Sequence, residues 1–251
     1  MQICFGIVLF AVLAFVAQVQ SHGMMMDPVG RASRWRYNNS APKNYDDNGL
    51  YCGGFNHQWA VNKGKCGLCG DDFSLRTPRP HEIGGLYGEG VIVKTYNMGN
   101  IIPVGIQITA NHKGHFYFHL CDLDRSKETE NCYQKHPVKL PDGSDKYWLP
   151  STKPGWYNLK LRLPKGLSCR HCSLRWTYVA GNNWGLCPNG TGAVGCGPQE
   201  NFRSCADIRI SGKSYQSPLE LNDKMFLPND SEDGYYFEIE NTLDGPVILE
   251  D

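Results

Sequence analysis

Residues 104–121, VGIQITANHKGHFYFHLC, decide the fold class of this chain. The segment Ile106-Gln107-Ile108-Thr109 alternates apolar and polar side chains, which is the pattern of a strand with one buried face. A polar break at residues 111–114 separates it from a second strand-like run at residues 115–121. Two such runs with no helical period between them favour an antiparallel β sheet.

The same pattern continues along the chain, and Leu159-Lys160-Leu161-Arg162-Leu163 alternates in the same way. We expect strands at residues 91–96, 104–110, 115–121, 157–163, 173–179 and 205–210. Short strands separated by Gly and Pro turns predict an all-β fold, an immunoglobulin/fibronectin III-like antiparallel β-sandwich. Residues 22–90 are rich in Gly, Asn, Asp and Pro, so they predict long disulfide-pinned loops with one short helix at residues 55–62.

Charge is unevenly distributed although the 251 residues sum to a net charge of zero. Residues 212–251 contain ten acidic side chains against Lys213 and Lys224, whereas the rest of the chain has 23 basic and 15 acidic residues. This predicts a domain boundary near residue 211 and a solvated acidic tail, in which residues 235–239 are a candidate edge strand. The neutral total gives no reason to expect a nucleic-acid or membrane partner, and we expect a monomer.

The first 21 residues have the features of a signal peptide. An uncharged apolar run at residues 3–17 precedes Val19-Gln20-Ser21, where small residues occupy the third and first positions before a cleavage site. The run is shorter than the roughly 20 residues that a membrane-spanning helix needs. We therefore expect a secreted, extracellular protein whose mature chain begins at His22.

Cysteine usage agrees with secretion, because removal of Cys4 leaves ten cysteines. An even number in a secreted chain predicts five disulfides, and the sequence does not decide their pairing. The two CxxC spacings, Cys66 to Cys69 and Cys169 to Cys172, are compatible with zinc, but they lie too far apart for the usual zinc ribbon. Three N-glycosylation sequons begin at Asn38, Asn189 and Asn229 and suggest a glycoprotein.

A histidine at the mature amino terminus has unusual coordination chemistry. Its α-amine and its imidazole together form a chelate for one metal ion, because an α-amine pKa near 8 lets a metal displace the proton at neutral pH. A third nitrogen would complete a planar nitrogen site, the geometry that selects Cu(II). The candidates for this third ligand are His57, His81, His112, His115, His119, His136 and His171.

Position along the chain favours His112 among these candidates. It lies in the polar break between two predicted strands, where a side chain at the end of a sheet can face a ligand. His115 and His119 lie inside a predicted strand, where packing is the more common role.

Several separated motifs resemble one enzyme family. They are HGMMMDPVGRASRWR from His22, DNGLYCGG from Asp47, KCGLCGD from Lys65, ITANH ending at His112, NWG from Asn183, and GCGPQENFRSCADI from Gly195. Together they are similar to the lytic polysaccharide monooxygenases of auxiliary activity family 15, over about residues 22 to 210. Members of this family are secreted copper enzymes that cleave chitin or cellulose by oxidation.

The resemblance implies roles for individual residues. His22, through amine and imidazole, and His112, through imidazole, match the histidine brace that holds one copper ion. Phe202 matches the axial aromatic position, where many family members have a tyrosine; phenylalanine cannot coordinate the metal there. Ala110 matches the small residue that leaves room beside the axial site. Cleavage would use an external reductant as electron donor, and O2 or H2O2 as co-substrate.

Three further residues are candidates for the surroundings of the copper. Gln199 or Glu200 is expected to place a polar group next to the metal, and the sequence does not decide between them. Tyr45 is a candidate aromatic contact for a sugar ring. The catalytic domain is thus predicted at residues 22–211.

Two other functions stay open at this stage. One is a secreted copper-binding protein without cleavage activity. The other is a chitin-binding module in which Trp35, Tyr45 and Trp59 stack on sugars and His22 is incidental. A glycoside hydrolase would need a facing pair of carboxylates, and no pair stands out.

Overall fold

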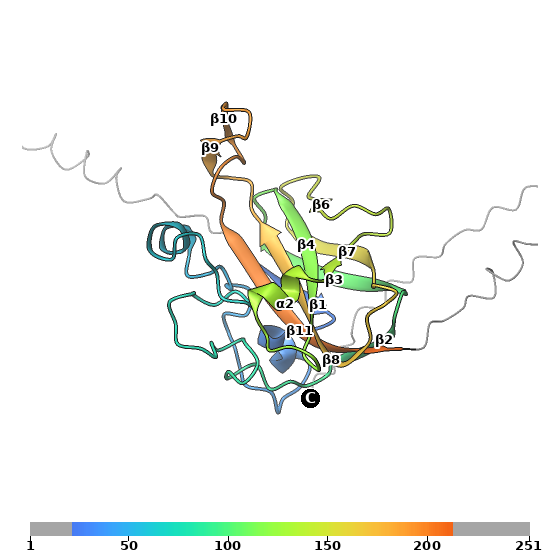
Figure 1. The fold of residues 1–251 in the computed structure, drawn as a ribbon. Coiled ribbons are helices and arrows are strands. Elements are labelled where there is room, and N and C mark those ends of the chain that lie inside the picture. Colours follow the sequence, from blue (N-terminus) through green and yellow to red (C-terminus); the bar gives the residue numbers. More distant parts are fainter. Residues whose placement is uncertain (1–21, 213–251) are drawn as a thin grey trace, which may run out of the picture. The chain divides into compact units, whose positions relative to one another are not determined.

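Two β sheets pack face to face in the computed structural model, which describes residues 22–212 (Figure 1). The smaller sheet is antiparallel and has the order β1–β3–β7: β1 His22–Asp27, β3 Ile101–Ala110 and β7 Gly155–Arg162. The edge strand β1, which begins at His22, pairs with the middle strand β3.

The larger sheet has the order β2–β11–β8–β4–β5, and β6 also pairs with β4. Its strands are β2 Lys94–Asn97, β11 Asn201–Ser211, β8 Cys169–Val179, β4 His115–Asp122, β5 Pro137–Val138 and β6 Tyr147–Trp148. A separate hairpin is formed by β9 Trp184–Leu186 and β10 Gly192–Val194. The short helices are η1 Arg31–Arg36, η2 His57–Val61 and α2 Glu130–Gln134.

The core lies between the two sheets, as the alternating pattern predicted. Ile106 and Ile108 of β3 are buried, and they belong to the same cluster as Phe116 of β4 and Trp176 of β8. Each buried aromatic or aliphatic side chain of this size contributes about 1.5–3 kcal/mol by leaving water. Successive residues of a strand point to opposite faces, so the alternate side chains of these strands face away from the core.

All six strands expected from the sequence are present, so the predicted β-sandwich is confirmed. One pairing, at an edge of the larger sheet, is parallel: β2 runs parallel to β11. The prediction that residues 22–90 contain only loops and one helix missed β1. Its Met-rich sequence has no alternation because Met24, Met25 and Met26 are all buried, on both faces of the strand. The helix expected at residues 55–62 is present as η2.

All ten expected cysteines form disulfides, so the prediction of five bridges is confirmed. The pairs are Cys52–Cys66, Cys69–Cys205, Cys121–Cys132, Cys169–Cys172 and Cys187–Cys196. Neither CxxC motif keeps a thiolate for zinc. Cys52–Cys66 and Cys187–Cys196 join loop residues to one another, and Cys69–Cys205 fastens the long N-terminal loop region to β11.

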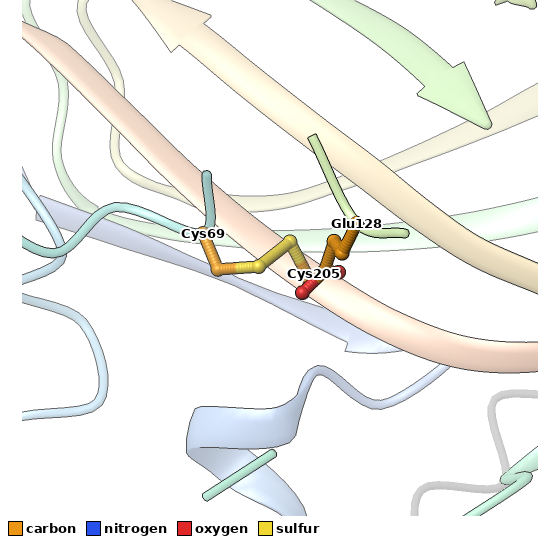
Figure 2. A group of neighbouring side chains, drawn as sticks. All are labelled: Cys69, Glu128 and Cys205. Atoms are coloured by element: carbon orange, nitrogen blue, oxygen red, sulfur yellow. A yellow bond between two sulfur atoms is a disulfide. The ribbon is translucent and has the colours of Figure 1, made fainter. Parts of the chain in front are cut away.

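One group of potential metal ligands lies in the interior, away from the amino terminus. Figure 2 shows Cys69, Cys205 and the Glu128 carboxylate side by side. The two sulfur atoms are bonded to each other, and Glu128 forms a salt bridge of 3.0 Å with Arg31. All three side chains are therefore already engaged within the protein.

A buried ionic cluster surrounds Arg31, which is 3% exposed. Its guanidinium donates two hydrogen bonds to Asp207, at 2.8 and 2.7 Å, and contacts Glu128 and the Ser173 hydroxyl. Burial by itself raises the pKa of Asp207, but the hydrogen bonds from Arg31 and His171 outweigh it and lower that pKa below its usual value. This cluster anchors the loop after β1 to strands β8 and β11.

The predicted signal peptide and nearly all of the predicted acidic tail, with its candidate strand at 235–239 and the sequon at Asn229, lie outside the described residues. Within residues 22–212, no helix is long and apolar enough to cross a membrane.

Candidate metal centre

Strand pairing brings His22 and His112 to the same end of the sandwich. In the β1–β3 pair, His22 lies opposite Ala110, and His112 follows Ala110 by two residues in the turn between β3 and β4. The side chain proposed to leave room beside the metal is therefore the cross-strand neighbour of the first histidine.

The backbone of His112 is fixed by hydrogen bonds from both sides. Its N–H donates to the hydroxyl of Tyr178 at 3.0 Å, and its carbonyl accepts from the N–H of Gly181 at 3.1 Å. The next residues of the turn, Lys113 and Gly114, have positive φ angles of 58° and 88°. A side chain at Gly114 would collide with the carbonyl of Val179, so only glycine allows this close approach.

The clearest indication that a metal ion binds at this place comes from the imidazole of His112. Its Nε2 atom is buried and has no hydrogen-bond partner among the described residues. A buried nitrogen without a partner costs about 1–3 kcal/mol, and such atoms need an explanation, of which an ion is one. An imidazole nitrogen, together with the amine and imidazole of His22, forms an all-nitrogen donor set that suits copper. The residues present therefore fit a copper ion.

Phe202 lies beside this donor set, at the start of β11. Its ring centroid is 6.4 Å from that of His22 and 6.2 Å from that of Tyr51, and it stacks on Tyr178 at 5.6 Å. Its side chain is fully buried and belongs to the main core cluster. Phe202 is thus a core residue that also lies next to the candidate ligand His22.

The structure separates the two polar candidates that sequence analysis left open. The Gln199 amide is fully engaged with the neighbouring loop: it accepts from the Asn183 N–H and donates to the carbonyls of Asn183 and Cys196. It therefore anchors the base of the β9–β10 hairpin. Glu200 instead lines a cavity of about 650 Å³, which Tyr51 and Asn182 also line. The ring centroids of Tyr51 and His22 are 6.3 Å apart, so this cavity lies next to His22. Glu200 is therefore a better candidate than Gln199 for a polar group near the metal.

Most of the other candidate histidines have different partners. His81 is buried between Asp71 and Asn44, His57 contacts Asp72, and His171 contacts Asp207. His115 and His119 lie on the outer face of β4, where they line a groove. His136 follows α2 in the connection to β5.

Aromatic side chains are exposed on loops close to this end of the sandwich. Tyr45 is 82% exposed and packs edge-on against Trp35 at 5.2 Å. Its loop reaches the amino terminus through Asn48, whose carbonyl accepts a hydrogen bond from Gly23 and whose amide donates to Thr109. Tyr45 therefore lies three residues before Asn48, which is bonded to both β1 and β3.

Sequence analysis missed the apolar face of the β9–β10 hairpin. Trp184, Leu186 and Val194 are each about two-thirds exposed, and their strand register places them on one face. The ring of Trp184 lies over Gly192, where a side chain would collide with it. The motif at residues 183–185 was visible in the sequence, but only the strand register shows that Trp184 has exposed apolar neighbours.

Comparison with known proteins agrees with this geometry. The family model described as lytic polysaccharide mono-oxygenase, cellulose-degrading, matches residues 22–208. A solved lytic polysaccharide monooxygenase AA15 from Thermobia domestica, in the Cu(I) state, is 45% identical, with a TM-score of 0.74 over 76% of this chain and 100% of that chain. No curated protein matches in a sequence search.

Two more distant solved structures share 17% and 16% identity, with TM-scores of 0.44 and 0.39. They are an AA10 lytic polysaccharide monooxygenase from Streptomyces lividans and a cellulose-active enzyme in complex with copper, matched over 75% and 76% of this chain and 99% and 100% of theirs. Because both TM-scores are under 0.5, we draw nothing from these likenesses. The family model and the 45% identical structure are sufficient: this chain belongs to the lytic polysaccharide monooxygenases of auxiliary activity family 15, copper-dependent oxidoreductases that act on polysaccharides with the help of a reductant.

Proposed function

We propose that His22 and His112 form the histidine brace of this enzyme and that it cleaves chitin or cellulose outside the cell. The single observation that carries the brace is the buried Nε2 of His112, which has no partner among the described residues and lies at the end of the sandwich where β1 begins. The signal peptide at residues 1–21, the catalytic domain at residues 22–211 and the monomeric state are parts of the same proposal.

Each residue of the proposed copper site would have a separate role. The amine and imidazole of His22 and the imidazole of His112 hold the copper, which when bound supplies the redox chemistry that activates O2 or H2O2. Tyr178 and Gly181 fix the backbone of His112, so its ring needs little reorganisation. Phe202 provides an apolar wall with no ligand atom, and Glu200 holds a carboxylate at the edge of the site.

The surroundings suit a polymer surface. Tyr45 is exposed on a loop and Trp184 on the β9–β10 hairpin, and their rings offer flat apolar faces to pyranose rings. A crystalline chain cannot enter a deep pocket, so an exposed metal with aromatic side chains around it is the appropriate arrangement.

The direct test is a mass spectrum of soluble products after copper-loaded mature protein is incubated with β-chitin, and separately with cellulose, in the presence of ascorbate. We expect oxidised oligosaccharides from at least one polymer, and the productive polymer identifies the substrate. The products should disappear without copper, without reductant and in His112→Ala. Tight Cu(II) binding without products on either polymer would contradict this function and support the copper-binding alternative.

A further inference from the structure

A groove follows the outer face of β4, on the side of the large sheet that faces away from the core. Phe116 and Phe118 point inward and are buried, so the alternate residues His115, Tyr117 and His119 point outward. These three line a cavity of about 510 Å³, whose other side is formed by Pro137, Val138, Lys139, Asp145 and Lys146. We call these residues, together with Trp148, the β4 groove.

Aromatic rings form a continuous row along this groove. Trp148 lies opposite His115 in the strand register, and their ring centroids are 4.7 Å apart. The row continues from His115 to Tyr117 at 6.1 Å and from Tyr117 to His119 at 5.3 Å. Trp148 is 65% exposed, so this end of the row is open to solvent.

The two imidazoles of the groove are uncharged at neutral pH, whereas Lys139, Asp145 and Lys146 are charged. Burial, followed by the nearby Lys146 ammonium, lowers the pKa of His115 to about 4, and burial with Arg175 does the same for His119. Lys139 is paired with Asp145 at 3.3 Å. The Nδ1 atom of His119 is buried without a hydrogen-bond partner among the described residues.

The imidazoles and aromatic rings of the groove favour one class of ligand. Neutral imidazoles can donate and accept hydrogen bonds with hydroxyl groups, and ring faces stack on the apolar faces of sugars. In the part of the chain that the structure describes, the groove holds no set of three converging metal ligands. A neutral polyol matches this surface better than an anion or a metal ion does.

The groove begins at the same end of the sandwich as the metal centre. His115 starts β4 three residues after His112, and Leu149, next to Trp148, donates its N–H to the carbonyl of Gly114. The row of rings then leads away from this end along the strand. A long polymer bound at the metal centre could therefore extend into the groove and contact several rings of the row. A small reductant would contact only one of them.

We propose that the β4 groove binds a second stretch of the polysaccharide substrate and retains the enzyme on the polymer between cleavage events. The proposal rests on the family's polysaccharide substrate and adds a binding site outside the copper-facing surface. Sugar rings stack on Trp148 and Tyr117, and His115 and His119 bond to hydroxyl groups.

The test measures binding of the copper-loaded mature protein to β-chitin and to cellulose by depletion isotherms. Trp148→Ala and Tyr117→Ala are expected to raise the apparent Kd by about 3- to 10-fold, the range for loss of one stacked ring. Trp156→Ala is the matched control, because this tryptophan is 54% exposed but lies on β7 of the opposite sheet. It should change the Kd by less than about 2-fold.

Two readouts separate this proposal from the proposed copper site. The Cu(II) electron paramagnetic resonance spectrum and copper affinity should be unchanged in both groove variants, and Trp148→Ala should also weaken binding in a His112→Ala background. Thermal unfolding identifies a variant that has lost its fold, and the exposed Trp148 serves if Tyr117→Ala fails this check. Wild-type binding by Trp148→Ala, or equal weakening by Trp156→Ala, would overturn the groove and leave the product assay of the copper site unaffected.

Discussion

Two clusters in this protein combine residue types that bind metals, and they differ in whether their polar atoms already have partners. In the first cluster, Cys69 and Cys205 form a disulfide and Glu128 pairs with Arg31 (Figure 2). In the second, the Nε2 of His112 is buried and has no partner among the described residues. The comparison teaches that proximity of metal-binding residue types does not by itself identify a metal site. A donor atom that the protein leaves unused is the better indicator.

The largest effect is expected from breaking the first cluster. Arg31→Met would leave the buried carboxylates of Asp207 and Glu128 without their cation, which costs about 3–5 kcal/mol in the free energy of unfolding. Chemical denaturation measures this loss. The control is Lys139→Met, whose salt bridge to Asp145 at 3.3 Å joins two exposed side chains and should contribute less than about 1 kcal/mol. Equal losses in the two variants would show that the cluster has no special role.

The next effect tests the second cluster at its amine. A protein that keeps Ser21 before His22 has an amide in place of the α-amine, so the chelate loses one donor. We expect Cu(II) affinity to fall by about 100-fold or more, since loss of groups that merely support a ligand already costs about 10- to 100-fold. Isothermal titration calorimetry of the extended and mature proteins measures the difference. Equal affinities would contradict the histidine brace.

A smaller effect is expected at the hydroxyl that holds the metal-binding turn. Tyr178→Phe removes the acceptor of the His112 N–H, and an unsatisfied buried N–H costs about 1–3 kcal/mol. We expect a lower unfolding temperature and an altered Cu(II) electron paramagnetic resonance spectrum. Tyr133→Phe removes a hydroxyl that contacts Glu128 and Ser173 in the first cluster, so it should lower stability and leave the spectrum unchanged. If both variants left the copper spectrum intact, Tyr178 would have no role at the site.

The smallest effect is expected on the exposed hairpin. Trp184→Ala removes an exposed ring that packs next to Gly192, and we expect about 3- to 10-fold weaker binding to the productive polysaccharide with unchanged copper affinity. Depletion isotherms measure the change. Trp156→Ala again serves as the exposed control on the opposite sheet, and it should bind normally. A wild-type isotherm for Trp184→Ala would remove the hairpin from the substrate surface.

Much of the fold and part of the site were predictable because they depend on local patterns. Strand periodicity identified the strands around residues 104–121, and the position of His22 directly after the predicted cleavage site indicated a chelate. By contrast, β1 was missed because Met24, Met25 and Met26 are buried on both faces and show no alternation. The choice between Gln199 and Glu200 could not be made, since adjacent residues of similar polarity differ only in their surroundings.

The sequence by itself indicated the longer strands after residue 90, the number of possible disulfides and a histidine directly after the predicted cleavage site, because these features depend on neighbouring residues or on counting. Only the tertiary structure decided the cysteine pairs, the register that places His22 opposite Ala110, and the packing that leaves Nε2 of His112 without a partner among the described residues. These depend on contacts between residues far apart in the chain. Such contacts are determined by the best simultaneous packing of all strands, which no local pattern encodes.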